Sequence, residues 1–410
     1  MLFYFLRYYC SEFQSGENKL RYHNILVRDF RTVKNNKVIN FNIGTTAHCP
    51  GTLAVLKKYL PETVKFTVWA DAPLETELAD MMNSRFPDVE IVCGDLATTP
   101  PAALLKAVDN ADLFLVSSGA GIAASVLKSL EQFQARTGKA SGAYGIGCTP
   151  SVLARLDHME FAWMRDPLSA EIARNSRCPA KGFAPDAVFD FDIADEKNAA
   201  EFMKKYELVP GKFICCIPGQ RHTPRWQFFD TPANPEKIAE NERFAEHDNA
   251  PLRKIIELAV TKYHLKVLIC PEQITEIDLI RPLIFDRLPA EIQKACVPMD
   301  EFWSPDLALG VYRASLGVFG VEMHSQVMAV GNNTPGVLLR HPQFGSKSEM
   351  WKTIGLEDWL IHTELPDYCD RAVQTVDRIL GNPDESARKL RRARTIIDQA
   401  NRQAIGQSFC

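Results

Sequence analysis

The sequence lacks most of the short motifs that identify a nucleotide, metal or nucleophile site. No G-x-G-x-x-G fingerprint, Walker A loop, G-x-S-x-G elbow or H-E-x-x-H pair occurs in its 410 residues. The 11 cysteines are scattered, without a C-x-x-C pair or a Cys/His cluster at zinc spacing. We therefore expect no metal site, and we interpret the thiols as reduced core residues of a cytoplasmic protein.

The sequence also lacks a large excess of charge of one sign and a long apolar run. The net charge is −4 and no Lys/Arg block stands out, so nothing indicates a nucleic-acid partner. The apolar amino terminus, MLFYFLRYYC, is about ten residues long and contains Arg7, whereas a membrane-spanning helix needs about 20 apolar residues. It also lacks the cleavage site of a signal peptide.

The remaining sequence alternates short apolar runs with amphipathic segments, and its length favours two domains. This alternation is typical of parallel sheets covered by helices on both faces. The expected strands are Val38–Ile43, Val64–Ala70, Val89–Cys93, Asp112–Val116, Gly142–Ile146, Glu160–Met164, Phe213–Ile217, Lys266–Cys270, Leu316–Phe319, Val337–Leu339 and Trp359–Ile361. We predict two Rossmann-like α/β domains that face a cleft, over residues 38–205 and 206–370. An amino-terminal extension (1–37) and a carboxyl-terminal helix (371–410) flank them.

One stretch of some thirty residues between Ile217 and Pro251 breaks this alternation. Loops of such length are usually functional lids or disordered. Three aromatic residues, Trp226, Phe228 and Phe229, favour a lid that packs on the rest of the protein. We expect a helix to begin only at Pro251.

Residues 315–340, SLGVFGVEMHSQVMAVGNNTPGVLLR, predict a strand, a tight turn, a helix and a second strand. This order places His324 in the first turn of a helix at the carboxyl edge of a sheet, beside Glu322 and Ser325. Open α/β sheets bind ligands at that edge, and helix starts attract anions. A histidine there can serve as an acid, a base or an anion ligand. The alternative is that these are helix-start residues with local bonds only.

The loop PGQRHTPR, which follows the expected strand Phe213–Ile217, supplies Arg221, His222 and Arg225. Guanidinium groups bind phosphate or carboxylate in bidentate fashion, so this loop is a candidate oxyanion site. A solvent-exposed basic loop is the alternative.

In the first domain, two segments that connect an expected strand to an expected helix also carry polar groups. In MRDPLS, Asp166 suits a helix cap and Pro167 the first helical position, and Arg165 beside them is expected to face the cleft. In GTTAHCPGTLAVL, Thr45 and His48 precede a helix and are candidates for binding a second substrate.

Three segments carry a family resemblance: MRDPLSAEIARNSRCPAKGFAPDAVF (164–189), FGVEMHSQVMAVGNNTPGVLL (319–339) and KTIGLEDWLI (352–361). Over roughly residues 38–365 the chain resembles the polysaccharide pyruvyl transferases. The resemblance implies a GT-B-like fold and transfer of a pyruvyl group from phosphoenolpyruvate to a sugar of a polysaccharide or glycan precursor, forming a ketal. No cofactor beyond this donor is implied, and membrane contact is expected only through a lipid-linked acceptor.

The chain departs from the family pattern at two places. Family members often have an arginine two residues before the helix-start histidine, where this chain has Glu322, and an acidic residue after Asn-x-Gly, where it has Thr45. We therefore expect Arg221 and Arg225 to hold the donor.

Arg165 and Lys347 are further candidate cations for the donor. His324 is expected to bind the donor and to protonate its methylene carbon. Glu322 is expected to orient His324 or to accept the proton of the sugar hydroxyl.

Two alternatives stay open. A GT-B glycosyltransferase that uses a nucleotide-sugar often has a second acid where this chain has Gln326. A non-catalytic relative that binds glycans or phosphate would account for the reversed charge at Glu322.

Overall fold

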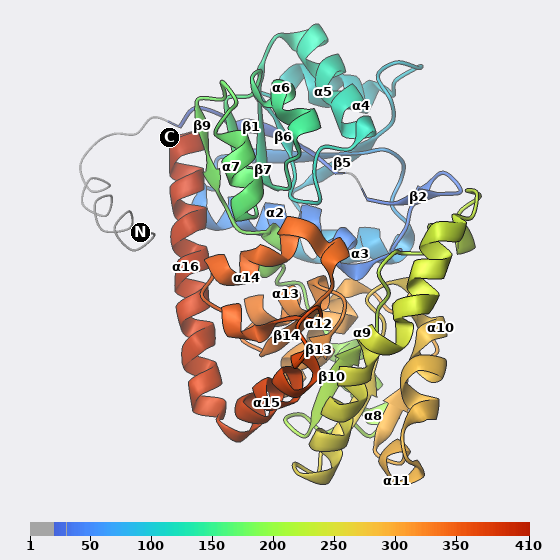
Figure 1. Ribbon diagram of the computed structural model, residues 1–410. Coiled ribbons are helices and arrows are strands. Elements are labelled where there is room, and N and C mark those ends of the chain that lie inside the picture. The colour runs from blue at the N-terminus through green and yellow to red at the C-terminus, as the bar shows by residue number, and fades with distance from the viewer. Residues whose placement is uncertain (1–19, 30) are drawn as a thin grey trace.

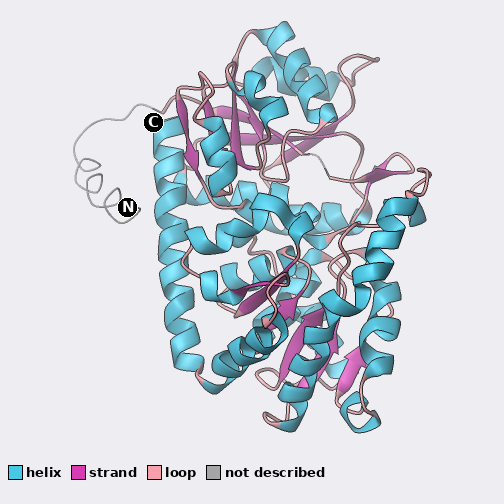
Figure 2. Ribbon diagram, viewed as in Figure 1, coloured by secondary structure: helices cyan, strands magenta, loops and turns pink. Residues whose placement is uncertain are grey.

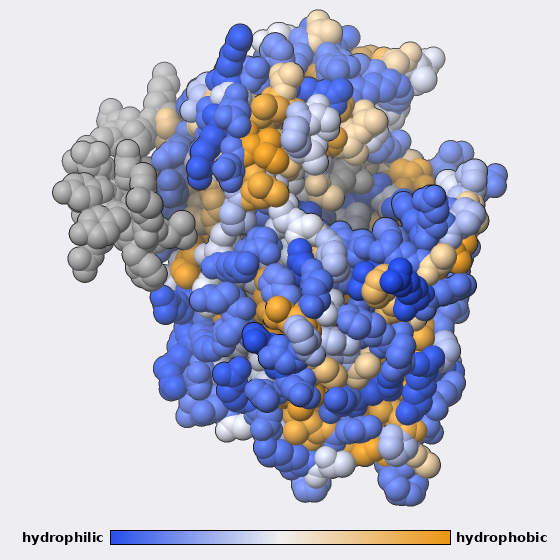
Figure 3. All heavy atoms as spheres, in the orientation of Figure 1, coloured by the Kyte–Doolittle hydropathy of each residue, from blue (hydrophilic) through white to orange (hydrophobic). Residues whose placement is uncertain are grey.

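The computed structural model describes residues 20–29 and 31–410, so the aromatic run at residues 1–10 lies outside the described residues. Two α/β domains lie one above the other, and each has a sheet with helices packed around it (Figure 1, Figure 2). Among the described residues, no helix combines the length and the apolar character that crossing a membrane requires. On the face in Figure 3, hydrophilic side chains predominate and apolar ones form small separate groups.

The first domain has a seven-stranded parallel sheet in the order β5-β4-β1-β6-β7-β8-β9. Its strands are β1 (Asn24–Arg28), β4 (Lys65–Ala70), β5 (Glu90–Cys93), β6 (Leu113–Val116), β7 (Ala140–Ile146), β8 (Phe161–Met164) and β9 (Ala180–Phe183). The helices around it are α2 (Ile43–Tyr59), α3 (Thr76–Arg85), α4 (Ala102–Asn110), α5 (Ala124–Thr137), α6 (Leu153–Leu156) and α7 (Pro167–Ala173).

The start of this domain differs from the prediction. The expected strand Val38–Ile43 is wrong, because only a short hairpin of β2 (Val33–Lys34) and β3 (Lys37–Val38) forms there before α2 begins. The first strand is instead β1, which pairs with β4 and β6 near the middle of the sheet. Residues 24–28 therefore belong to the domain rather than to an extension over 1–37. Their apolar run of three residues was too short to stand out from the polar sequence around it.

The second domain has a six-stranded parallel sheet in the order β12-β11-β10-β13-β14-β15. Its strands are β10 (Phe213–Ile217), β11 (Lys266–Ile269), β12 (Cys296–Pro298), β13 (Val318–Gly320), β14 (Gly336–Arg340) and β15 (Leu360–His362). The helices are α8 (Glu196–Lys205), α9 (Pro235–Thr261), α10 (Ile277–Leu279), α11 (Ala290–Gln293), α12 (Pro305–Ala314), α13 (His324–Gly331), α14 (Met350–Thr353) and α15 (Tyr368–Gly381). Every residue of β10 is buried, as expected for a strand covered on both faces.

The expected lid between Ile217 and Pro251 is largely wrong, because helix α9 occupies its second half. Its cap is Asn234, whose side chain accepts a hydrogen bond from the Lys237 N–H, and Pro235 occupies its first turn. Pro251 lies inside this helix rather than at its start. Only residues 218–234 form a connecting segment, which contains a short 3-10 turn at Arg225–Gln227.

The chain ends in two helices rather than the single one expected over 371–410, because it breaks at Asn382 before Pro383. The second of them, α16 (Pro383–Phe409), extends from the lower domain to the upper one (Figure 1). It bonds there through Asp398 to Lys58 at 2.8 Å and through Ser408 to the Trp163 indole N–H at 2.7 Å. Helix α16 thus joins the two domains across their boundary.

Candidate functional site

A cavity of about 690 Å³ lies where the two domains face each other. It is at the carboxyl edges of both sheets, the place where open α/β sheets bind ligands. Charged and polar side chains of both domains contribute to its lining: Arg31, Asn42, Thr45, His48, Asp71, Ser125 and Arg165 from the first, and Thr223, Arg225, Glu272, Gln273, Glu322, His324 and Lys347 from the second.

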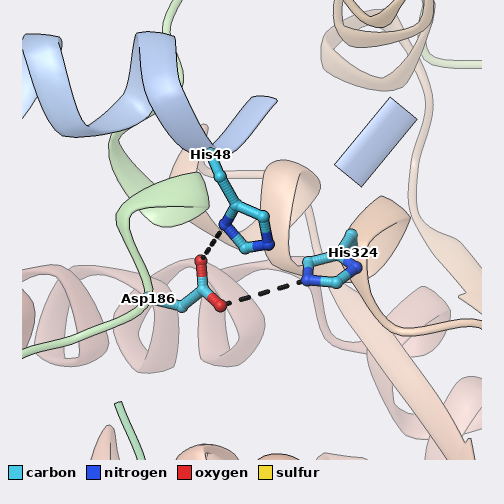
Figure 4. A group of neighbouring side chains, drawn as sticks. All are labelled: His48, Asp186 and His324. Atoms are coloured by element: carbon cyan, nitrogen blue, oxygen red, sulfur yellow. Dashed lines mark ion pairs between the residues drawn. The ribbon is translucent and has the colours of Figure 1, made fainter. Parts of the chain in front are cut away.

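Three side chains from distant parts of the chain meet at this cavity (Figure 4). His48 lies in α2, Asp186 follows β9, and His324 begins α13. The Nδ1 atom of His48 is 3.2 Å from Asp186 Oδ1, and the Nε2 atom of His324 is 4.0 Å from Asp186 Oδ2. The two imidazole rings face each other edge to face, with centroids 5.0 Å apart. The domain boundary therefore carries two imidazoles around one carboxylate.

A second carboxylate fixes the orientation of His324. Glu272, which follows β11, lies 3.3 Å from the Nδ1 atom of His324 and accepts a hydrogen bond of 2.6 Å from the Ser325 backbone N–H. The carboxylate of Glu272 thus accepts a hydrogen bond from a backbone N–H group that the start of α13 leaves without a partner inside the helix. With Nδ1 donating to Glu272, the Nε2 atom of His324 is left to act as acid or base.

A glycine makes this approach possible. A Cβ atom on Gly44, in the first turn of α2, would lie 2.1 Å from the Cβ atom of His324. No larger residue fits at position 44 without moving the histidine. Asn42 caps the same helix by accepting from the Thr45 N–H at 2.8 Å, which brings Thr45 to the cavity.

Burial and charge set the ionisation of these groups. Burial lowers the pKa of His48 despite the nearby Asp186, so the ring is neutral at pH 7. Burial alone would raise the pKa of Asp186, but the interaction with His48 and the charge of Arg165 hold it well below its usual value. Burial likewise opposes ionisation of Glu272, yet hydrogen bonds from His324 and Ser325 lower its pKa. Both carboxyl groups are therefore carboxylates at neutral pH.

Besides Arg31, three cationic side chains line the cavity: Arg165, Arg225 and Lys347. The Arg165 Nη1 atom is 2.6 Å from Asp186 Oδ2, whereas its buried Nε atom has no hydrogen-bond partner among the described residues. Burial lowers the pKa of Lys347, and the charge of Glu322 opposes this shift. Arg225 is exposed, and its guanidinium lies 5.3 Å from the ring of Phe41.

The expected clamp of Arg221 with Arg225 is not formed. Arg221 binds Asp248 at 2.7 and 3.1 Å, and His222 lies 2.7 Å from Glu240. Neither residue lines the cavity. The physical reason is α9, which carries both acids and occupies sequence that we expected to be a loop.

Of the other predicted residues, Asp166 lies where the sequence predicted it, whereas the Ser325 side chain does not reach the cavity. Asp166 caps α7 by accepting from the Ser169 N–H at 2.9 Å, as predicted. Ser325 contributes its backbone N–H, while its buried hydroxyl lies 3.1 Å from the Tyr312 hydroxyl. Sequence reasoning missed Glu272 and Asp186. Glu272 could have been found, because it follows a predicted strand at the same edge as Arg221.

The cluster of His48, Asp186 and His324 also has the donor types of a metal site, with ligand atoms within 4.8 Å of one another. However, Asp186 Oδ2 is already in contact with the Arg165 guanidinium at 2.6 Å. A fixed positive charge at this distance would repel a cation. We therefore interpret the cluster as an acid–base and anion-binding site.

No family model and no curated protein matches this chain. Solved structures do match, over nearly the full length. S. aureus MnaA in complex with UDP has 12% identity, a TM-score of 0.54, and coverage of 94% of each chain. UDP-GlcNAc 2-epimerase from Neisseria meningitidis, bound to UDP-GlcNAc, has 12% identity, a TM-score of 0.53, and coverage of 94% of this chain and 99% of its own.

A third match is E. coli ADP-heptose lps heptosyltransferase II, with 12% identity, a TM-score of 0.51, and coverage of 88% of this chain and 99% of its own. These similarities show the fold. The chain has the GT-B-like arrangement of two Rossmann-like domains around a cleft, as predicted from the sequence.

Proposed function

We propose that this protein is a group-transfer enzyme that binds a phosphate-bearing donor and a sugar together in the cavity between its domains. The observation that carries the proposal is the meeting of His48, Asp186 and His324 beside the cations Arg165 and Lys347. Imidazoles held by carboxylates are suited to moving protons, and buried cations are suited to holding an oxyanion. Both kinds of group are needed when a sugar hydroxyl attacks an activated donor.

The arrangement gives each side chain a role. The donor's oxyanion binds at Arg165 and Lys347. His324, oriented by Glu272, exchanges a proton with the reacting group through Nε2. His48 is neutral and accepts the proton of the sugar hydroxyl, while Asp186 stabilises the imidazolium that forms. A positioned acid or base of this kind contributes about 10²–10⁴-fold in rate.

A nucleotide-diphosphate sugar is the first candidate donor. Its support comes from matched structures that name UDP, UDP-GlcNAc and ADP-heptose, and from the volume of the cavity. At about 690 Å³ this cavity is within the range of about 300–1,000 Å³ typical of ligand pockets. Arg225 at the cavity provides a further cation for a diphosphate.

Phosphoenolpyruvate is the second candidate donor, and a separate observation favours it. The segments that resemble polysaccharide pyruvyl transferases supply Arg165 and Asp186 (164–189) together with Glu322 and His324 (319–339). These two segments meet at the cavity, where Arg165 and His324 both lie beside Asp186. The resemblance and the site therefore involve the same residues.

The test is phosphorus NMR of the protein with UDP-sugars, ADP-sugars or phosphoenolpyruvate, each with and without a panel of sugars. Nucleoside diphosphate released only when a sugar is present supports glycosyl transfer, and inorganic phosphate released in the same way supports pyruvyl transfer. Glu240→Gln, outside the cavity, should match the unchanged protein. If no donor is consumed while sugars still bind, the non-catalytic alternative replaces the proposal.

A further inference from the structure

The cavity contains a second buried arginine, which the proposed roles leave unused. Arg31 lines the cavity and is only 4% exposed. The Asp29 carboxylate holds it in place, accepting from the Arg31 backbone N–H at 3.2 Å and from its Nε at 2.6 Å. The Arg31 Nη2 atom lies 2.5 Å from the same carboxylate, whereas its Nη1 atom has no hydrogen-bond partner among the described residues. A fixed guanidinium group therefore has N–H donors available to a ligand.

The start of helix α5 belongs to the same part of the sheet edge. Strand β6, which precedes α5, pairs with β1, which precedes Arg31. Ala123 occupies the cap position of α5 and makes no side-chain bond to the first N–H groups of the helix. Ser125, the second residue of α5, is exposed and lines the cavity. A helix start without a side-chain cap attracts anions, so α5 and Arg31 favour the same kind of ligand.

The acid closest to Arg31 along this edge is already compensated. Asp71 follows β4, the other strand that pairs with β1, and it lines the cavity. Its carboxylate forms an ion pair with the buried guanidinium of Arg28. Its remaining lone pairs can accept hydrogen bonds from sugar hydroxyls.

This group of residues is separate from the cation at the histidines. Arg165 follows β8, and the strands β6 and β7 lie between β8 and β1. Three strand spacings place the two strand ends about 14 Å apart. Each arginine is held at its own end, Arg31 by Asp29 and Arg165 by Asp186. One phosphate group cannot contact both, so the cavity offers two oxyanion sites.

We propose that Arg31 and the start of α5 bind an oxyanion of the acceptor, so that the acceptor is a sugar that carries a phosphate or a carboxylate. This inference rests on the proposed function, because it assigns the acceptor class for the same cavity. The donor's oxyanion occupies the site at Arg165, and the acceptor's oxyanion occupies the site at Arg31. The acceptor's hydroxyl group then lies between them, within reach of His48.

The experiment is a ligand-observed NMR titration of the full chain with glucose 6-phosphate, glucuronate and glucose. These probes share a sugar ring and differ in carrying a phosphate, a carboxylate or no charge. The unchanged protein should bind at least one of the anionic sugars about tenfold more tightly than glucose, as expected for a charge-assisted hydrogen bond. Preference for one of them identifies the anion as a phosphate or as a carboxylate.

Two variants test the assignment. Arg31→Met should lose the preference for the anionic sugar. Ser125→Asp should also lose it, because the new carboxylate repels the anion; this variant keeps Arg31 and should fold, since aspartate is favourable in the first turn of a helix. Both variants should bind glucose as the unchanged protein does.

Each variant has a matched control. Arg136→Met removes an exposed arginine of the first domain that lies outside the cavity lining. Ala103→Asp places the same charge at the second residue of α4, which is exposed and also lies outside the lining. Both controls should keep the preference of the unchanged protein.

The outcomes separate this inference from the proposed function. Equal affinity for all three sugars overturns the inference, and so does a preference that persists in Arg31→Met or in Ser125→Asp, or that is lost equally in the controls. If anionic sugars bind through Arg31 but no donor is consumed with them, the subsite stands and the proposed group transfer does not. If a donor is consumed with neutral sugars alone, the group transfer stands and the subsite does not.

Discussion

His324 shows how much of the site depends on its immediate neighbours. Its Nδ1 atom lies 3.3 Å from Glu272, its Nε2 atom lies 4.0 Å from Asp186, and its Cβ atom leaves room only for a glycine at position 44. The sequence predicted this histidine at a helix start because the strand–turn–helix pattern around it is strong. It could not predict that an acid following β11 would orient the ring.

Replacing His324 by glutamine should lower kcat by about 10²–10⁴-fold, because glutamine keeps a hydrogen bond to Glu272 but transfers no proton. The thermal unfolding temperature should change little. Steady-state kinetics and circular dichroism measure the two effects. A variant that keeps full activity would remove His324 from the mechanism.

The raised pKa of Glu322 predicts how stability changes with pH. The pKa is about 8 in the folded protein and 4.5 for the ordinary side chain. Between these values the folded state holds a proton that the unfolded state releases, so this group destabilises the fold progressively as pH rises. Glu322→Gln abolishes that contribution.

The unfolding temperature of Glu322→Gln, relative to the unchanged protein, should therefore be higher at pH 8.5 than at pH 5. Differential scanning calorimetry at the two pH values measures this difference. An equal effect at both pH values would mean that Glu322 is ionised in the folded protein.

Among the elements, helices α2 and α9 differ most from the prediction, because each begins in sequence that we expected to be non-helical. The strands with long apolar runs, such as β4, β7 and β10, lie within a few residues of their predicted bounds. Helix α9 was missed because its first half is rich in polar residues and its interior contains Pro251. That omission also misplaced Arg221, whose acidic partners are carried by this helix.

Helix α2 provides a test of close packing at the site. In Gly44→Ala the new Cβ would lie 2.1 Å from the Cβ of His324, so the histidine must move. A shift of about 1 Å at a catalytic group can cost about 10²-fold in rate. We expect a loss of kcat larger than the loss of stability, measured by kinetics below the unfolding temperature.

Gly310→Ala is the matched control. Its new Cβ would lie 2.6 Å from the Cβ of Ala199, away from the cavity lining. This variant should lose stability and keep its activity. Equal activity losses in both variants would show that general loosening, rather than displacement of His324, is responsible.

At the scale of the whole molecule, the site exists only because two domains meet. His48 and Arg165 belong to the first domain, whereas Glu272, His324 and Lys347 belong to the second. The sequence predicted both domains and the cleft, since strand and helix periodicity repeats in each half. It could not predict which side chains meet across the cleft, because that depends on the relative position of the domains.

Helix α16 is one element that sets this position. Arg394 binds Asp190 and Asp398, and Asp190 lies just after the site residue Asp186. Arg394→Ala would leave the buried Asp190 without this cation and should cost about 1–3 kcal/mol in the free energy of unfolding. Chemical denaturation measures this value. Arg371→Ala, which breaks an exposed ion pair, should cost distinctly less.

The most direct test of the central claim is a crystal structure of the protein soaked with UDP or phosphoenolpyruvate. Our account predicts that a phosphate group lies within hydrogen-bond distance of Arg165 or Lys347, with the reacting atom of the donor next to His324. A phosphate bound at Arg221, or a donor bound away from the cavity between the domains, would contradict it.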